Sequence, residues 1–198
     1  MEDYSSSLIA RTIHESVSVK QQLAESCVKA IHITGTMLSN CAMRNGLIML
    51  CGNGGSAADS QHLAAELVVR LRSTVERRAI KALALTTDSS ILSAGGNDYG
   101  FDRVFSRQVE AFGTADDVLI AISTSGTSRN VVLAVEEAKR RGVQTIGLLG
   151  GSGGVLRELC DACVVVPSSV TARIQESHIL VGHIWCEMIE NTIVEAGR

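Results

Sequence analysis

A histidine and a glutamate lie four residues apart in the segment CGNGGSAADSQHLAAELVVR, which covers residues 51–70. On a helix, His62 and Glu66 share one face. A histidine and a carboxylate at this spacing can bind one metal ion or act as an acid–base pair, and a solvated surface pair is the alternative. Asp59, one turn earlier, is placed to orient His62. A functional site is favoured because a glycine-rich loop leads directly into the same helix.

That loop, GNGGS at residues 52–56, follows a predicted strand. Its glycines permit a tight turn and let backbone N–H groups approach a ligand, and Ser56 is placed to cap the helix with its hydroxyl towards that ligand. An ordinary glycine-rich turn is the alternative. The loop is neither a Walker loop nor a G-x-G-x-x-G fingerprint, so nucleotide binding by those modes is excluded.

A second loop, STSGTSRN at residues 123–130, follows another predicted strand and opens another helix. Hydroxyls and N–H groups at the positive end of a helix dipole can bind phosphate without a lysine. A serine- and threonine-rich helix cap is the alternative, but five hydroxyl residues in six positions exceed what a cap requires. These residues are Ser123, Thr124, Ser125, Thr127 and Ser128.

The segment ARIQESHILVGHIWCEMIE, residues 172–190, places Gln175, His178 and His183 on one predicted helix. A lone histidine in such an apolar segment is often a core or interface residue. Gln175 and His183 are eight residues apart, which is about 12 Å of helical rise. If both serve one ion, either the helix begins irregularly at Gln175 or the two groups come from different subunits.

Two weaker signals complete the candidates. Residues 96–100, GNDYG, are typical of a turn. Cys160 and Cys163 have the spacing of a metal or redox pair, but there is no second pair and Cys163 falls in a predicted strand. We therefore do not predict a metal site at these cysteines.

The elements that must position these residues alternate along the chain. Helical spacing of apolar residues predicts one long helix or a pair of helices over 4–44. Short branched-aliphatic runs, typical of strands buried on both faces, follow at residues 47–53, 80–86, 117–124, 144–150 and 162–168. Predicted helices lie between and after them at 56–71, 88–112 with a break at Gly95-Gly96, 128–141, 153–160 and 172–195. This alternation predicts an α/β fold with a doubly wound parallel sheet, whose ligands bind beyond the carboxyl ends of the strands.

Composition limits the classes of partner. The chain has 198 residues and a formal net charge of −3, so neither nucleic acid nor a membrane surface is expected as a partner. No apolar run approaches the ~20 residues that span a bilayer, and the N-terminus has no signal core. Six cysteines in apolar segments indicate buried thiols in a reducing compartment, so we expect a cytoplasmic protein.

Taken in order, these segments resemble the sugar isomerase (SIS) domain family, and the resemblance runs from the N-terminal helices to the last helix. It is carried by CGNGGSAADSQHLAAEL, ALTTDSSIL, GNDYGFDRVFSRQV, ISTSGTS and RIQESHILVGHIWCEMIE. The resemblance implies a three-layer αβα fold with a flavodoxin-like, five-stranded parallel sheet. It also implies one domain over 1–198, with a helical region 1–45 used in oligomerisation and an α/β core over 46–198.

The resemblance also implies site roles. One zinc per subunit would be held by His62, Glu66, Gln175 and His183, and Glu66 and His183 would be the catalytic acid–base pair. Substrate would contact Asn53, Gly54, Gly55, Ser56, Glu66, Arg70, Asn97, Asp98, Ser123, Thr124, Ser125, Ser128 and Gln175. The implied assembly is a homotetramer with its active site between subunits. We therefore expect Glu66 and His183 of one site to come from different chains.

The branch of the family that the segments resemble most implies an aldose–ketose isomerase. It would convert D-sedoheptulose 7-phosphate to D-glycero-D-manno-heptose 7-phosphate, the first step towards nucleotide-activated heptose for lipopolysaccharide and other surface glycans. Two alternatives stay open from the residues. One is an isomerase of another phosphosugar, and the other is a non-catalytic relative that binds a phosphosugar or the replication initiator.

Overall fold

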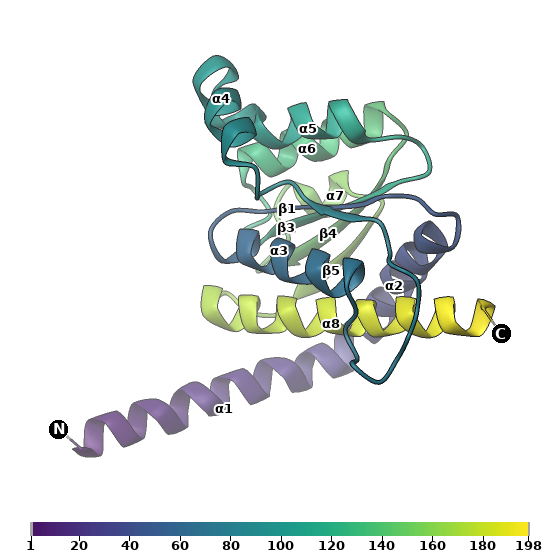
Figure 1. Cartoon of the computed structure of the whole chain (residues 1–198). Coiled ribbons are helices and arrows are strands. Elements are labelled where there is room, and N and C mark those ends of the chain that lie inside the picture. The colour runs from purple at the N-terminus through teal and green to yellow at the C-terminus, as the bar shows by residue number, and fades with distance from the viewer. Residues whose placement is uncertain (1, 198) are drawn as a thin grey trace.

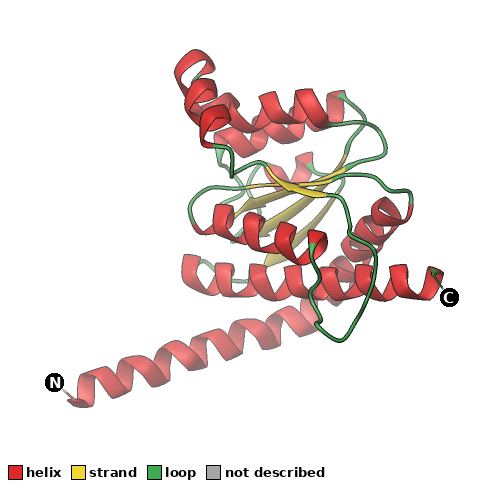
Figure 2. Cartoon of the chain, in the orientation of Figure 1, coloured by secondary structure: helices red, strands yellow, loops and turns green. Residues whose placement is uncertain are grey.

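The computed structural model describes residues 2–197, and five short strands form one all-parallel sheet in the order β2-β1-β3-β4-β5 (Figures 1 and 2). The strands are β1 (Ile48–Cys51), β2 (Ala82–Ala84), β3 (Val118–Ser123), β4 (Gln144–Gly150) and β5 (Ala162–Val166). Each one lies inside an apolar run that was predicted as a strand. The predicted α/β fold with a five-stranded parallel sheet is confirmed.

Alternate side chains of each strand enter two separate cores. Ile48 and Leu50 of β1 pack on one face of the sheet, and Met49 and Cys51 pack on the other. All four are fully buried, as expected for a parallel sheet covered on both sides.

Helices cover both faces, which gives the three-layer arrangement (Figure 1). One face carries α2 (Val28–Met43), α3 (Gly55–Val68) and α8 (Thr171–Ala196). The other carries α4 (Ser89–Tyr99), the 3-10 turn η1 (Phe101–Arg103), α5 (Val104–Phe112), α6 (Arg129–Arg140) and the short α7 (Leu156–Leu159). Because α3 and α6 leave neighbouring strands β1 and β3 towards opposite faces, the sheet has its switch in strand order between those strands.

The N-terminal region is a pair of helices rather than one. The first, α1 (Glu2–Ser26), ends beside Cys27, where α2 begins after a change in backbone direction. Val19 and Leu23 of α1 are buried, but the earlier part of the helix extends away from the body of the molecule (Figure 1). Residues 1 and 198 of the expected domain lie outside the described residues.

One predicted boundary is wrong. The break expected at Gly95-Gly96 does not occur, because α4 continues through both glycines to Tyr99. The chain turns at Gly100 instead, where φ is +81° and a residue with a side chain would be strained. None of the helices over residues 2–197 combines the length and apolar character that a membrane span requires.

Candidate active site

The loops after β1 and β3 meet at the switch in strand order. The side-chain amides of Asn53 and Asn130 form a reciprocal pair, with hydrogen bonds of 2.9 and 2.8 Å between their amide nitrogens and oxygens. This pair ties the glycine loop to the start of α6. The amide of Asn53, a predicted substrate contact, is therefore already hydrogen-bonded to the first turn of α6.

The glycine loop begins α3 as predicted, but its cap differs. The helix starts at Gly55 with Gly54 in the cap position at φ +54°, whereas Ser56 is a buried residue of the first turn. The prediction that Ser56 caps the helix is wrong, because the glycines let the helix begin two residues earlier. A β-carbon at residue 55 would collide with the Gln175 amide, so Gln175 lies against this loop.

Internal hydrogen bonds shape the loop after β3. Buried Ser123 accepts the N–H of Gly126 at 3.1 Å through its Oγ, which also lies 3.0 Å from the Oγ of Ser128. Ser125 accepts the N–H of Thr127 at 3.3 Å, and its side chain is exposed. Ser128 occupies the cap position of α6 without a side-chain cap bond. The predicted hydroxyls thus lie together in one loop, but the hydroxyls of Ser123 and Ser128 hydrogen-bond to one another.

A cavity of about 300 Å³ opens beside this loop at the carboxyl ends of β3, β4 and β5. Thr124 and Ser125 line it, as predicted for a phosphate site. Three further hydroxyl residues, which were not predicted as site residues, also line the cavity: Ser152, Ser169 and Thr171. The sequence could have indicated these residues, since each belongs to a short polar stretch after a predicted strand. The same pattern identified residues 123–128.

His62 and Glu66 of α3 converge with His183 of α8. The Nε2 atoms of His62 and His183 are 2.8 Å apart, and the His62 Nε2 lies 3.4 Å from Glu66 Oε1. One ligand atom from each residue lies within 4.8 Å of the others. Among the side chains that the structure describes, residues 5–197, this is the only group of three or more His, Cys, Asp or Glu placed to hold one ion.

A glycine brings the two helices close enough for this contact. A β-carbon at Gly182 would collide with the Leu63 side chain, and both residues neighbour the histidines in sequence. The side chains of His62 and Glu66 remain 48% and 21% exposed. In one chain, therefore, the His62–Glu66–His183 group is assembled but open to solvent.

Gln175 and His183 occupy different positions along α8. The helix runs without a break from Thr171 to Ala196, so it does not begin irregularly at Gln175. Gln175 contacts Gly55 at the start of α3, whereas His183 contacts His62 two turns further along. The structure also places Glu66 and His183 together within one chain, because α3 and α8 pack side by side. The expectation that these two come from different chains is corrected.

The remaining predicted residues make other contacts. Arg70 follows the end of α3 and pairs with Glu76 at 3.0 Å. Asn97 and Asp98 lie in the last turn of α4, where the Asn97 amide donates to Asp98 Oδ1 at 2.7 Å, and no residue of α4 is buried. Because α4 belongs to the layer opposite α3 and α8, one chain does not join them to the histidines.

Burial shifts the pKa of two side chains near the site. His178 is fully buried and contacts the Leu149 carbonyl oxygen through Nε2 at 3.0 Å, and burial lowers its pKa to about 4. Asp59 does not hydrogen-bond to His62; its Oδ2 is buried without a partner. Burial raises the pKa of Asp59, and the charge of His62 opposes that rise.

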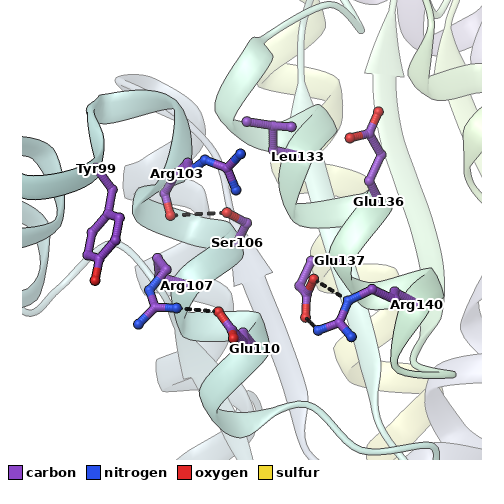
Figure 3. Close-up of a pocket in the computed structure, with 9 residues that line it drawn as sticks. All are labelled: Tyr99, Arg103, Ser106, Arg107, Glu110, Leu133, Glu136, Glu137 and Arg140. Atoms are coloured by element: carbon purple, nitrogen blue, oxygen red, sulfur yellow. Dashed lines mark hydrogen bonds and ion pairs between the residues drawn. The ribbon is translucent and has the colours of Figure 1, made fainter.

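A charged groove on the opposite layer is a second cavity, of about 340 Å³, between α5, η1 and α6 (Figure 3). Its charges largely neutralise one another, because Arg107 pairs with Glu110 and Arg140 pairs with Glu137. It contains none of the predicted site residues, and helical pairs of this kind are ordinary surface features.

Comparison with known proteins decides the family. The SIS domain model matches residues 13–150. A phosphoheptose isomerase of Leptospira biflexa is 49% identical over 186 residues, which cover 94% of this chain and 95% of that protein. The chain belongs to the phosphoheptose isomerases of the SIS domain family.

Other phosphoheptose isomerases agree. The protein of a Nitratiruptor species is 62% identical over 145 residues, covering 73% of this chain and 76% of that one. A solved phosphoheptose isomerase from Neisseria gonorrhoeae superposes with a TM-score of 0.88 at 44% identity, covering 94% of this chain and 98% of that one. The predicted family and the predicted enzyme class, a sugar-phosphate isomerase, are confirmed.

Proposed function

We propose that the chain interconverts D-sedoheptulose 7-phosphate and D-glycero-D-manno-heptose 7-phosphate and so supplies the heptose of lipopolysaccharide and other surface glycans. The observation that carries this proposal is the convergence of His62, Glu66 and His183 in a chain of the phosphoheptose isomerase family. A non-catalytic phosphosugar-binding protein would not need an acid–base group there.

The same three residues fit a zinc ion. Two imidazole nitrogens and one carboxylate oxygen form a donor set found in catalytic zinc sites, which leave a further position for substrate. His62, Glu66 and His183 would hold the ion, and Gln175 is the proposed fourth ligand. When bound, zinc would polarise the substrate carbonyl.

The chemistry assigned to the chain's own residues is proton transfer. Aldose–ketose isomerisation moves a proton between C1 and C2 through an enediolate, so it needs a base at carbon and an acid at oxygen. We assign the carbon proton to Glu66. His183 would exchange protons with the oxygens when its Nε2, which lies 2.8 Å from the His62 Nε2, is not bound to the ion, because a metal-bound imidazole nitrogen has no proton to give.

The phosphate end of the substrate is assigned to the loop after β3. Thr124 and Ser125 line the adjoining cavity, and the start of α6 adds the favourable end of its helix dipole. Ser123 and Ser128 shape this loop through their contact. Asn53, Gly54, Gly55 and Ser56 would face the sugar across the switch point, where loops after neighbouring strands meet.

We propose that a second copy of the chain completes the site within a homotetramer. Gln175 lies against Gly55, and Asn97 and Asp98 lie in the opposite layer, so none of the three joins the His62–Glu66–His183 group in one chain, and that group is open to solvent. A neighbouring chain would cover the group and bring these contacts to it. Residues 1–45 supply an apolar surface for assembly, since Leu8, Ile9, Ile13 and Val17 of α1 are exposed.

We place this reaction in the cytoplasm. All six cysteines are free thiols, and five of them are buried. Burial raises the pKa of the Cys51 and Cys186 thiols to about 12, so they are unreactive core residues at neutral pH.

The proposal is tested by turnover with and without metal. We expect about one zinc per chain and production of heptose 7-phosphate that a chelator abolishes and added zinc restores. His62→Ala should lose both zinc and activity. A folded, zinc-loaded protein without turnover would favour the non-catalytic alternative, and normal zinc content in His62→Ala would show that the ligand set is wrong.

A further inference from the structure

The relative position of α3 and α8 decides whether Glu66 and His183 face one another. Gly182 against Leu63 sets the distance between the helices beside the histidines. A second contact links α8 to the end of α3. It lies two turns of α8 beyond His183 and just past Glu66 in α3. It consists of Arg77 and Glu190, neither of which the sequence analysis identified.

Arg77 binds the end of α3 that carries Glu66. Its Nη2 donates to the Glu66 carbonyl oxygen at 2.7 Å, and its Nη1 donates to the Leu67 carbonyl oxygen at 2.9 Å. The last carbonyls of a helix have no partner within the helix, and an arginine side chain can satisfy them. The side chain of Arg77 is only 1% exposed, so this cap is an interior contact.

Glu190 binds Arg77 from α8. It is fully buried, and its Oε1 accepts from Arg77 Nε at 3.1 Å. Seven residues, or two helical turns, separate it from His183, so both lie on one face of α8. Burial alone would raise the pKa of Glu190, but hydrogen bonds from Arg72 and the Leu71 N–H, with the charge of Arg77, lower it.

Glu190 also fixes the segment that leaves α3. Its Oε1 accepts the Leu71 N–H at 2.9 Å, and its Oε2 accepts from Arg72 Nε at 3.0 Å. Residues 69–79 carry no helix or strand, so these bonds hold a segment that has no ladder of its own. The same carboxylate therefore anchors Arg77 and the chain immediately after the helix that bears Glu66.

We infer that Arg77 and Glu190 are positioning residues, which hold the carboxylate of Glu66 and the imidazole of His183 in register by joining α3 to α8. Arg77 acts on the backbone of Glu66 itself, and Glu190 acts from the face of α8 that presents His183. Displacement of a reacting group by about 1 Å can cost on the order of a hundredfold in rate. The inference rests on the proposed roles of Glu66 and His183.

Arg78 provides a control in the same segment, although Arg78 is exposed and the Arg77 side chain is buried. It follows Arg77 in the same segment, and its Nη2 donates to the Ala42 carbonyl oxygen at 2.6 Å, near the end of α2. Arg77→Met and Arg78→Met thus each remove an arginine that binds a helix-end carbonyl, but α2 carries no site residue. A merely structural role would give both variants lower thermal stability and a normal kcat per folded chain.

The experiment measures kcat, KM and zinc affinity for both variants, with folded chain counted from the fluorescence of Trp185, the one tryptophan. We expect Arg77→Met to lower kcat about tenfold or more with KM changed less than about twofold, and to lose zinc to a competing chelator more readily. Arg78→Met should keep a normal kcat and zinc affinity. Glu190→Gln should resemble Arg77→Met, and the double variant should lose less than the product of the single effects.

Other outcomes decide against the inference. A folded Arg77→Met with a normal kcat and zinc affinity overturns it. If Arg77→Met does not fold, Arg77→Lys replaces it: this variant keeps the charge but cannot bridge two carbonyls and Glu190, so a normal kcat would equally overturn the inference. Glu66→Gln separates the two proposals. An inactive Glu66→Gln beside an Arg77→Met with normal kcat and zinc affinity would overturn the positioning role alone, whereas activity in Glu66→Gln would contradict the proposed role of Glu66, on which the inference rests.

Discussion

Ser123 and Ser125 lie two residues apart in the loop after β3, but they differ in what they contact. Ser123 is buried and bonds to Gly126 and Ser128, whereas Ser125 is exposed beside the cavity. Ser123 therefore shapes the loop, whereas the exposed hydroxyl of Ser125, which contacts its neighbour Thr127, faces the cavity where phosphate would bind.

The two serines should respond differently to removal of their hydroxyls. Ser125→Ala should raise KM about tenfold or more with little change in Tm, because it removes a donor to a charged group and, within the protein, exposed contacts with Thr127. Ser123→Ala should raise KM and also lower Tm, because the buried Gly126 N–H loses the Ser123 hydroxyl and keeps only the Ser123 carbonyl oxygen, at 3.3 Å, as an acceptor. Steady-state kinetics and thermal unfolding check both, and an unchanged KM in Ser125→Ala would remove this loop from the phosphate site.

At the residue scale, the sequence identifies groups whose spacing is local. His62 and Glu66 could be predicted because four residues on one helix determine their common face. Arg77 and Glu190 could not, because 113 positions separate them and only the packing of α3 on α8 joins them. The distinct roles of Ser123 and Ser125 were equally invisible, since burial depends on the neighbouring loop.

At the scale of elements, α8 combines site and core residues on one helix. His178 packs under the end of β4, where its Nε2 contacts the Leu149 carbonyl oxygen, and its Nδ1 is buried without a partner. The charged form would lose its hydration there, which is why burial lowers the pKa of His178 to about 4.

This histidine makes the fold sensitive to mild acid. An exposed histidine in the unfolded chain has a pKa near 6.5, so between about pH 4 and pH 6.5 the unfolded chain binds more protons than the folded one. The free energy of unfolding should therefore fall as pH falls through this window, by roughly 3 kcal/mol in all.

Denaturant titrations of wild type and His178→Gln from pH 7 to pH 4.5 test this. Glutamine keeps an N–H donor for the Leu149 carbonyl oxygen but does not titrate. The free energy of unfolding of His178→Gln should therefore depend less on pH in this window than that of the wild type. Lowered carboxylate pKa values, such as that of Glu190, act below the ordinary value of 4.5 and do not obscure the comparison. If the free energy of unfolding fell equally with pH in the two proteins, His178 would not be the cause of the acid sensitivity.

Whole elements were predicted more successfully than their ends. The five strands could be placed because each is a short branched-aliphatic run, buried on both faces. The break in the fourth helix was placed at Gly95-Gly96, but α4 tolerates both glycines and ends only at Gly100, where a positive φ is needed. Glycine composition alone does not distinguish a tolerated glycine from a required one.

At the scale of the whole molecule, one chain leaves several surfaces uncovered. The first half of α1 extends from the body with Leu8, Ile9 and Ile13 exposed, and α4 has no buried residue. The His62–Glu66–His183 group is open as well. The apolar residues over 4–44 predict helices from their spacing, but the spacing cannot show which helical surfaces a second chain covers.

Mixing inactive variants tests which residues of one chain contribute to the active site of a neighbouring chain. If Gln175 serves a neighbouring chain, Glu66→Gln and Gln175→Ala should complement after subunit exchange. In a random mixture half of the pairs are mixed, and each mixed pair has one of its two sites intact, so activity should recover to about a quarter of wild type.

Glu66→Gln mixed with His183→Ala is the matched control. The structure places both residues in one chain, so no mixed site there receives both intact groups, and the mixture should stay inactive. Recovery in this control, with none for the Gln175 mixture, would reverse the assignment of groups to chains.

The central claim, proton transfer between C1 and C2 by Glu66, is tested most directly by proton NMR of D-sedoheptulose 7-phosphate in D2O. The wild-type chain should produce heptose 7-phosphate and introduce solvent deuterium at the carbon that receives the proton, because a carboxylate exchanges its proton with water. Glu66→Gln, correctly folded, should do neither. An unchanged sugar spectrum with the wild-type chain, or full turnover by Glu66→Gln, would contradict the account.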